Sequence, residues 1–275
     1  MLTDYHVHLR PDDDGTPADA FFTADNAARY REVATERGIA ELGVSEHVYR
    51  FHDALDVWNH PHWCKVAADD LEEYVAFVRE ETDLRLGIEA DFVPGREDRM
   101  ANLLERHPWD FVVGSVHFLR DLSLDTDEFS VWGRGESPEK VWRRYFETVA
   151  EAARSGLYDI MGHPDLVKVW GRTRPAPDGD LRRFYEPAIE AFAEAGVAVE
   201  VSTAGLRKPV REIYPSRAFL ELVVDAGCPI ALSSDAHVPD DLGHGYDEAV
   251  ALLEAVGVTE LSVFERRQRR LEPIG

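Results

Sequence analysis

Two histidines close to the start of the chain have the spacing of paired metal ligands. His6 and His8 form an H-x-H motif in the segment Asp4-Tyr5-His6-Val7-His8. Because alternate residues of a β-strand point to the same face, a strand here would project both imidazoles together. Two adjacent imidazoles supply half of a divalent metal site. The motif therefore predicts metal binding if the rest of the chain places further ligands nearby.

Further histidines and carboxylates stand at the ends of other apolar runs. These run ends are Ser45-Glu46-His47, Ile88-Glu89-Ala90-Asp91, Val116-His117, Gly162-His163 and Asp235-Ala236-His237, whereas the sixth run supplies no histidine. A buried imidazole without a bonding partner costs about 1–3 kcal/mol. One shared metal cluster explains these positions better than a separate accommodation at each of them. Mixed imidazole and carboxylate ligands suit Zn, Mn or Fe.

The apolar runs alternate with amphipathic segments, and this order defines the expected fold. The strand-like runs are 4–8, 40–45, 84–90, 111–116, 158–162, 197–201 and 229–233. The helix-like segments are 24–37, 67–81, 97–106, 138–155, 181–195, 216–226 and 246–256, and several are followed by glycine, which suits a helix C-terminus. Seven strand–helix units predict a parallel α/β fold. Ligands at the carboxyl ends of many strands favour a barrel, whose active site is built there.

Composition limits the class of protein. The chain has 275 residues, 44% of them hydrophobic, and we expect a single domain over residues 1–275 with a sizeable core. A net charge of −23 disfavours binding to long nucleic acids, which needs clustered Lys and Arg. No apolar run could span a bilayer, and the N-terminus lacks the layout of a signal peptide. Cys64 and Cys228 are far apart, so no disulfide framework is indicated and a cytoplasmic location is expected.

The combined motifs resemble a known family. The initial H-x-H, the later single His and Glu ligands and the segment Asp235-Ala236-His237 are similar to those of the polymerase-and-histidinol-phosphatase (PHP) superfamily. The resemblance covers nearly the whole chain and is greatest to the stand-alone histidinol-phosphate phosphatases of histidine biosynthesis. It implies a single-domain distorted (β/α)7 barrel with two or three divalent metal ions (Zn, Mn or Fe) at the carboxyl ends of the strands. It also implies hydrolysis of L-histidinol phosphate to L-histidinol and phosphate.

The resemblance further implies which residues hold each ion. One ion would be bound by His6, His8, Glu89 and Asp235. Glu89 would bridge to a second ion, bound also by His117 and His163. A third ion would be bound by His47 and His237. In the family a further histidine follows the H-x-H; here that stretch reads Arg10-Pro11-Asp12-Asp13-Asp14-Gly15, and by spacing Asp14 is the first choice to replace it.

The expected chemistry gives roles to several of these residues. Phosphate monoesters hydrolyse extremely slowly without help, and metal ions activate water, clamp the phosphoryl oxygens and stabilise the leaving alkoxide. Glu89 would lie beside the attacking water, and Asp235 or His237 would relay a proton. Arg207 and Lys208, after the sixth run, are expected to bind the substrate phosphate, because Arg forks onto two oxygens and Lys adds a point charge.

Other interpretations share parts of this pattern. The same barrel could hydrolyse another small phosphate ester or a mononucleotide, which an acidic chain does not exclude. It could be a regulatory domain that binds metal without activity, although such a domain has no need of a nearly full ligand set. It could be a metal-dependent amidohydrolase, but that family typically uses a bridging lysine on a middle strand, where this chain offers Glu89 and His117. The oligomeric state is not indicated.

A second H-x-H motif occurs at His60-Pro61-His62. Proline interrupts it in a long loop without an apolar strand, so a surface or lid role is expected rather than metal binding. The neighbouring Trp58 and Trp63 could stack on a substrate that contains imidazole, although packing is the simpler expectation.

Overall fold

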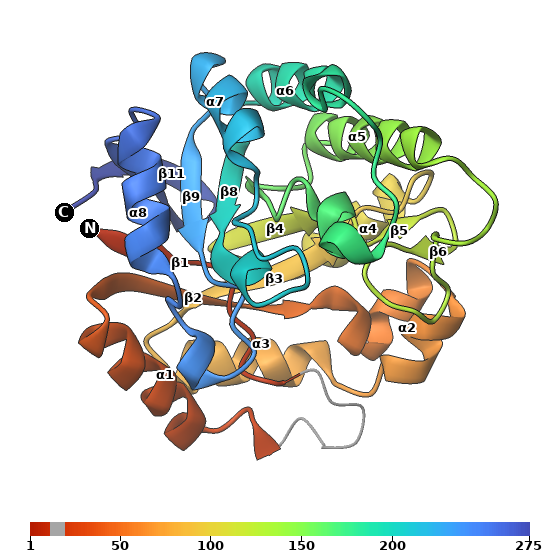
Figure 1. Ribbon diagram of the computed structural model, residues 1–275. Coiled ribbons are helices and arrows are strands. Elements are labelled where there is room, and N and C mark those ends of the chain that lie inside the picture. Colours follow the sequence, from red (N-terminus) through yellow and green to blue (C-terminus); the bar gives the residue numbers. More distant parts are fainter. Residues whose placement is uncertain (12–19) are drawn as a thin grey trace.

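A parallel sheet of seven strands forms the centre of the molecule. The computed structural model of the chain describes residues 1–11 and 20–275. The strands are β1 (Leu2–Asp4), β2 (Ile39–His47), β3 (Arg85–Asp91), β4 (Phe111–Ser115), β7 (Ile160–Met161), β8 (Ala198–Ser202) and β9 (Ile230–Ser233), in the order β1-β2-β3-β4-β7-β8-β9. The segments that directly follow the last and first strands also meet, through a parallel bridge between Val7 and Ala236. The sheet is therefore a nearly closed seven-stranded barrel, which confirms the predicted fold class (Figure 1).

Helices surround this barrel on the outside (Figure 1). They are α1 (Ala24–Glu36), α2 (Pro61–Val66), α3 (Leu71–Glu81), α4 (Glu97–Leu104), α5 (Pro138–Arg154), α6 (Arg182–Ala195), α7 (Arg217–Asp225) and α8 (Tyr246–Ala255). Seven of them have bounds close to the predicted ones, except that α3 begins four residues later because the Asp70 side chain accepts a hydrogen bond from the Glu73 N–H and caps the helix. The eighth, α2, was not predicted: it begins where a loop was expected, with the His60 side chain as its cap and Pro61 in its first turn. Within the described residues, no helix combines the length and the apolar character needed to cross a membrane.

The first strand is shorter than predicted. It was expected over residues 4–8, but pairing with β2 ends at Asp4. Beyond it the chain stays extended between two neighbours: the Ser45 N–H donates to the Val7 carbonyl (2.8 Å), and the His8 N–H donates to the Ala236 carbonyl (2.8 Å). His6 and His8 therefore lie on an extended segment that closes the barrel mouth rather than inside a regular strand.

Two antiparallel hairpins were not predicted. One consists of β5 (Phe118–Leu119) and β6 (Leu122–Ser123), and the other of β10 (Glu260–Glu265) and β11 (Gln268–Pro273). The second has mainly polar residues on its exposed strand, which hides the alternation that normally indicates a strand. Its buried Val263 and Phe264 pack on the interior of the barrel, and the Phe264 N–H donates to the Tyr5 hydroxyl (3.0 Å).

One phenylalanine ring fills much of the barrel interior. Phe111 on β4 is fully buried, and Gly43 on β2 and Gly87 on β3 leave space for its ring. A Cβ atom at either glycine would lie less than 3.0 Å from the Phe111 ring.

We expect Gly87→Ala to destabilise the fold by about 1–3 kcal/mol, because overpacking a full core forces the backbone or the ring to move. Chemical denaturation of the wild type and the variant measures the loss. Adding Phe111→Leu should recover part of it, since the smaller side chain vacates the space. Strictly additive effects of the two substitutions would contradict this explanation.

Candidate metal centre

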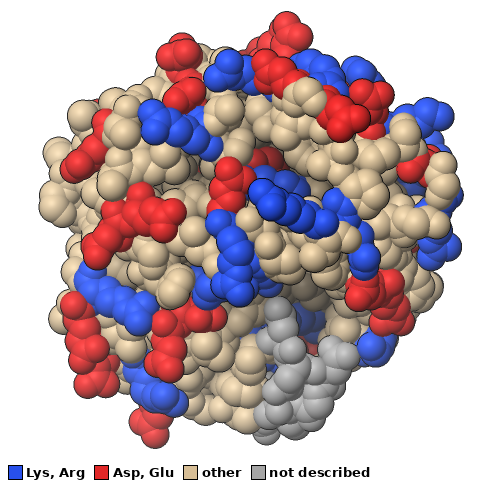
Figure 2. Space-filling model, viewed as in Figure 1, with Lys and Arg blue, Asp and Glu red and all other residues tan. Residues whose placement is uncertain are grey.

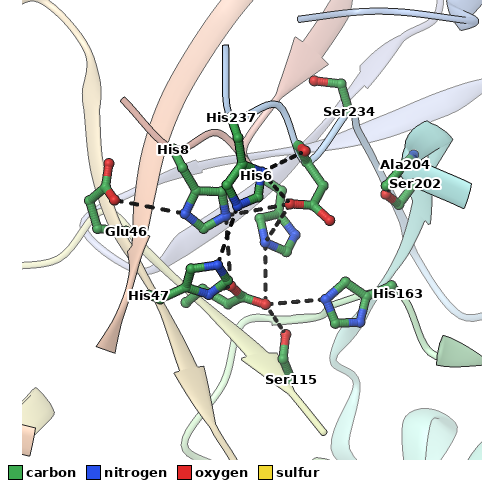
Figure 3. Close-up of polar contacts among 12 residues, drawn as sticks. His6, His8, Glu46, His47, Ser115, His163, Ser202, Ala204, Ser234 and His237 are labelled. Atoms are coloured by element: carbon green, nitrogen blue, oxygen red, sulfur yellow. Dashed lines mark hydrogen bonds and ion pairs between the residues drawn. The ribbon is translucent and has the colours of Figure 1, made fainter. Parts of the chain in front are cut away.

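The predicted ligands converge at the carboxyl ends of the strands. Two of them lie within strands: His47 ends β2, and Glu89 lies in β3. The others lie two to four residues after a strand: His6 and His8 after β1, His117 after β4, His163 after β7, and Asp235 and His237 after β9. Figure 3 shows His6, His8, His47, His163 and His237 around one common point. Asp14, the aspartate favoured for the third ion, lies outside the described residues, as do Asp12 and Asp13.

Glu89 lies at the centre of this cluster and is 1% exposed. Its Oε1 atom is 3.3 Å from His6 Nε2, 3.4 Å from His117 Nε2 and 3.2 Å from His163 Nε2. Its Oε2 atom is 3.7 Å from His8 Nε2 and also contacts His47 Nδ1. A carboxylate that faces imidazoles with both oxygens has the arrangement needed to bridge two cations.

Asp235 forms the second carboxylate of the cluster. Its Oδ1 atom is 3.8 Å from His6 Nε2, 3.5 Å from His8 Nε2 and 3.5 Å from His237 Nδ1. The backbone at Asp235 has φ = 53°, a left-handed conformation that residues other than glycine rarely adopt. Such a conformation persists where the surrounding structure enforces it, and it often marks a functional position.

The donor set fits divalent cations. Three groups of side chains each place their ligand atoms within 4.8 Å of one another: His6, His8 and Asp235; His6, Glu89 and His163; and His8, His47 and His237. Among the described residues, His6 Nε2, His8 Nε2, Glu89 Oε2 and Asp235 Oδ1 are buried without a hydrogen-bond partner. Buried polar atoms are normally paired, so their convergence indicates that a cation belongs among them.

The electrostatics of the cluster also favour a cation. Burial lowers the pKa of His6, but the carboxylates of Glu200 and Glu89 outweigh burial and raise that pKa well above its usual value. Burial likewise opposes protonation of His117, yet Asp91 and Glu89 raise its pKa to about 10. These carboxylates attract positive charge into the site, whether it comes from a proton or from a metal ion.

We expect metal binding to release protons. At neutral pH both His6 and His117 hold a proton in the metal-free protein, because both pKa values are raised. A ligand must be deprotonated, so affinity for Zn²⁺ should rise with pH, by roughly 100-fold per pH unit for two displaced protons. Calorimetric titration between pH 6 and 8, in buffers with different ionisation enthalpies, counts the protons. In Asp91→Asn, which removes the partner of His117, the count should fall by about one; an affinity that is independent of pH would contradict the expectation.

Residues outside the predicted set orient the ligands. His6 Nδ1–H donates to Glu200 Oε1 (2.9 Å), and the His163 backbone N–H donates to Glu200 Oε2 (2.5 Å). On the other side, His117 Nδ1–H donates to Asp91 Oδ1 (2.9 Å). Glu200 was not predicted, although a carboxylate between two valines in an apolar run is itself a signal. Such partners fix the ring orientation and the tautomer of a metal-binding histidine.

Glu46 orients the chain that follows the first H-x-H motif. Its Oε1 atom accepts hydrogen bonds from the backbone N–H groups of Leu9 (2.7 Å) and Arg10 (3.3 Å). Its Oε2 atom pairs with Arg50 Nη1 (3.1 Å). Glu46 is fully buried, so it acts as a structural anchor for the segment carrying His8.

The two basic residues after β8 have different environments. Arg207 Nη2 donates to the backbone carbonyls of Ser234 (2.8 Å) and Asp235 (2.9 Å), and Arg207 Nε lies 3.3 Å from Asp241 Oδ2. Lys208 is exposed and lines the pocket over the cluster. Arg207 thus holds the backbone of a candidate ligand, and Lys208 faces the space where a substrate would enter.

That pocket opens directly onto the cluster and has a volume of about 460 Å³. Its lining includes His47, His117, His163, Asp235 and His237, the cations Arg10, Arg50, Lys65 and Lys208, and the aromatic side chains of Tyr49 and Trp170. Figure 2 shows Lys and Arg side chains gathered near the centre of one face, although the chain carries a net charge of −23.

The second H-x-H motif is separate from the cluster. His60 is 3% exposed and stacks on Trp58, with ring centroids 4.4 Å apart. His62 lines the pocket over the cluster, beside Tyr49. Trp63 is fully buried and packs against Trp58. Packing is therefore the observed role of both tryptophans, and only His62 of this motif reaches the pocket.

Comparisons with known proteins agree with this architecture. The profile of the PHP domain matches residues 20–204. A probable histidinol-phosphatase from Deinococcus radiodurans is 32% identical, with 99% of both chains covered. The histidinol-phosphatase of Bacillus subtilis is 26% identical, with 89% of this chain and 96% of the relative covered. The crystal structure of histidinol phosphate phosphatase from Lactococcus lactis, complexed with zinc, L-histidinol and phosphate, has the same fold, with a TM-score of 0.70, 19% identity and 98% of each chain covered.

Proposed function

The chain belongs to the PHP domain family, and from this membership and the geometry of the metal centre we propose that it hydrolyses L-histidinol phosphate to L-histidinol and phosphate. One observation carries the proposal: Glu89, buried between imidazoles on both of its oxygens, lies beneath a pocket rich in cations. Histidinol-phosphatase is also the name of relatives that cover most of this chain.

We propose two or three divalent ions, of Zn, Mn or Fe, at this centre. His6 Nδ1 is bonded to Glu200, so its Nε2 atom is the one available to an ion, together with His8 and Asp235. Glu89 would be shared with a second ion held also by His117 and His163. His47 and His237, whose Nε2 atoms lie 3.3 Å apart, would hold a third ion, with Asp14 as the proposed further ligand. Bound ions would activate water, clamp the phosphoryl oxygens and stabilise the leaving alkoxide.

The side chains that line the pocket have separate tasks in this proposal. Arg10 and Lys208 would attract and orient the phosphate dianion. Arg10 is 5% exposed, and its Nε atom has no hydrogen-bond partner among the described residues. Arg207 would also bind the phosphate, through its Nη1 atom, which has no hydrogen-bond partner among the described residues, while its Nη2 atom holds the Asp235 carbonyl.

Proton transfer is assigned to the pocket side of the cluster. Asp235 lines the pocket, whereas Glu89 is not among its described lining residues. Asp235 Oδ1 is 3.5 Å from His237 Nδ1, and His237 also lines the pocket. We therefore propose that Asp235 or His237 relays a proton next to the substrate, through an atom that does not bind an ion.

A phosphate-release screen tests the proposal. Metal-loaded protein is assayed with histidinol phosphate, simple alkyl phosphates, mononucleotides and oligonucleotides. We expect the highest kcat/KM with histidinol phosphate. A preference for a mononucleotide would overturn the assigned substrate but keep the phosphatase chemistry, and absence of phosphate release from every ester would overturn both.

A further inference from the structure

The pocket has an uneven distribution of charge. Its described lining contains four Lys and Arg side chains, three of which pair with carboxylates outside the lining: Arg10 with Asp69, Arg50 with Glu46 and Lys65 with Glu128. Within the described lining, and outside the metal cluster, only Asp125 contributes a carboxylate. Cations suit a phosphate, but they repel an ammonium group on the same substrate. A substrate with both groups therefore needs an acidic position away from the phosphate, and within the described lining Asp125 is the residue that can supply it.

The backbone next to Asp125 is firmly attached to the metal centre. The Leu124 N–H donates to the carbonyl of His117 (2.9 Å), a candidate metal ligand. The Leu124 carbonyl accepts hydrogen bonds from the indole N–H groups of Trp170 (2.7 Å) and Trp132 (3.2 Å). The position of Asp125 is thus fixed relative to the cluster, and Trp170 lines the same pocket.

The Asp125 side chain is itself oriented and has free capacity. Ser123 Oγ donates to Asp125 Oδ1 (2.8 Å) and accepts from the Thr126 N–H (3.1 Å), which fixes the turn. No hydrogen bond or ion pair reaches Asp125 Oδ2 from the described residues. Asp125 is only half-buried, so this oxygen can bind a ligand in the pocket without a large desolvation cost.

We propose that Asp125 is a specificity-determining residue that binds the ammonium group of an amino-alcohol phosphate whose phosphate lies at the metal centre. The inference rests on the proposed function and deepens it. It says which part of the pocket recognises the ammonium group, which is separated from the ester oxygen of the substrate by two carbon atoms. The cations then orient the phosphate end, and Asp125 orients the opposite charge.

Two esters of equal length test this assignment. Phosphoethanolamine keeps the ammonium in the position it has in histidinol phosphate, and propyl phosphate replaces it with a methyl group. Asp125→Asn preserves the shape of the side chain and the acceptor for Ser123. We expect Asp125→Asn to lower kcat/KM for phosphoethanolamine about 10- to 100-fold, because a hydrogen bond between charged groups is lost, and the loss should appear mainly in KM. The kcat/KM for propyl phosphate should change less than about twofold, because this ester has no ammonium group.

The matched control is Asp127→Asn, which removes the same charge from the same loop. Asp127 is exposed, pairs with Arg174 and does not line the pocket, so both esters should keep their rates. An equal loss for both esters in Asp125→Asn would show a structural role and overturn the proposal, as would equal rates in Asp125→Asn and wild type. Turnover of histidinol phosphate by the wild type tests the proposed function separately. The ratio of kcat/KM values for phosphoethanolamine and propyl phosphate can be measured whether or not histidinol phosphate is the preferred substrate.

Discussion

Glu89→Gln is expected to remove most of the bound metal and to lower kcat by about 1,000-fold or more. The substitution keeps the size of the side chain but replaces a charged bridging group by a neutral amide, one end of which repels cations. Both oxygens of Glu89 face imidazoles, so no orientation of the amide can serve both sides. Elemental analysis of the purified variant gives ions per chain, and phosphate release gives the rate.

The matched control for this variant is Glu200→Gln. Glu200 is a fully buried carboxylate in the same site, but it bonds His6 on the Nδ1 side, away from the cluster. Loss of such an orienting partner typically costs about 10- to 100-fold in metal affinity or activity. If Glu89→Gln retained full metal content and a rate above that of Glu200→Gln, the central role of Glu89 would be wrong.

The alternation of apolar runs and amphipathic segments predicted the parallel α/β fold, and the candidate ligands at the strand ends favoured a barrel over an open sheet. Strands that are buried on both faces appear in the sequence as continuous apolar runs. Helix ends were indicated by glycines such as Gly196, which has φ = 64° in the structure, a backbone conformation that favours glycine. The β10–β11 hairpin did not give such a pattern, because one of its strands is mostly exposed and polar. Its place at the barrel depends on Phe264 contacting Tyr5, a contact between distant parts of the chain that local patterns do not contain.

The site was predictable in its residue types but not in its contacts. Metal-binding residue types at strand ends were visible in the sequence, because strand order brings them to one edge. The direction of each side chain was not visible. Arg207 at the substrate phosphate stays a prediction: its Nη2 atom donates to the Ser234 and Asp235 carbonyls, whereas its Nη1 atom is buried without a hydrogen-bond partner among the described residues. Glu200 was passed over, although it orients two candidate ligands.

The second H-x-H motif, at His60 and His62, can be compared with the first because both occur in the same chain. Both pairs have the same spacing, but only the first lies at the mouth of the barrel with carboxylates around it. His6 and His8 are fully buried among Glu89, Asp235 and Glu200. No carboxylate forms an ion pair with His60 or His62 in the described structure, and His60 is packed on Trp58. Spacing alone therefore does not define a metal site; buried carboxylates opposite the imidazoles do.

The double variant His6→Ala/His8→Ala should accordingly lose metal and lower kcat/KM by about 1,000-fold or more, since two ligands disappear from one centre. His60→Ala/His62→Ala should keep its full metal content, with changes confined to KM and stability, because His62 lines the pocket without joining the cluster and His60 caps α2. Elemental analysis and circular dichroism of both folded variants, followed by kinetics, separate the two motifs. Equal metal content in the two variants would show that the pair at the barrel mouth does not bind the ions, and the assignment of the centre would then have to be abandoned.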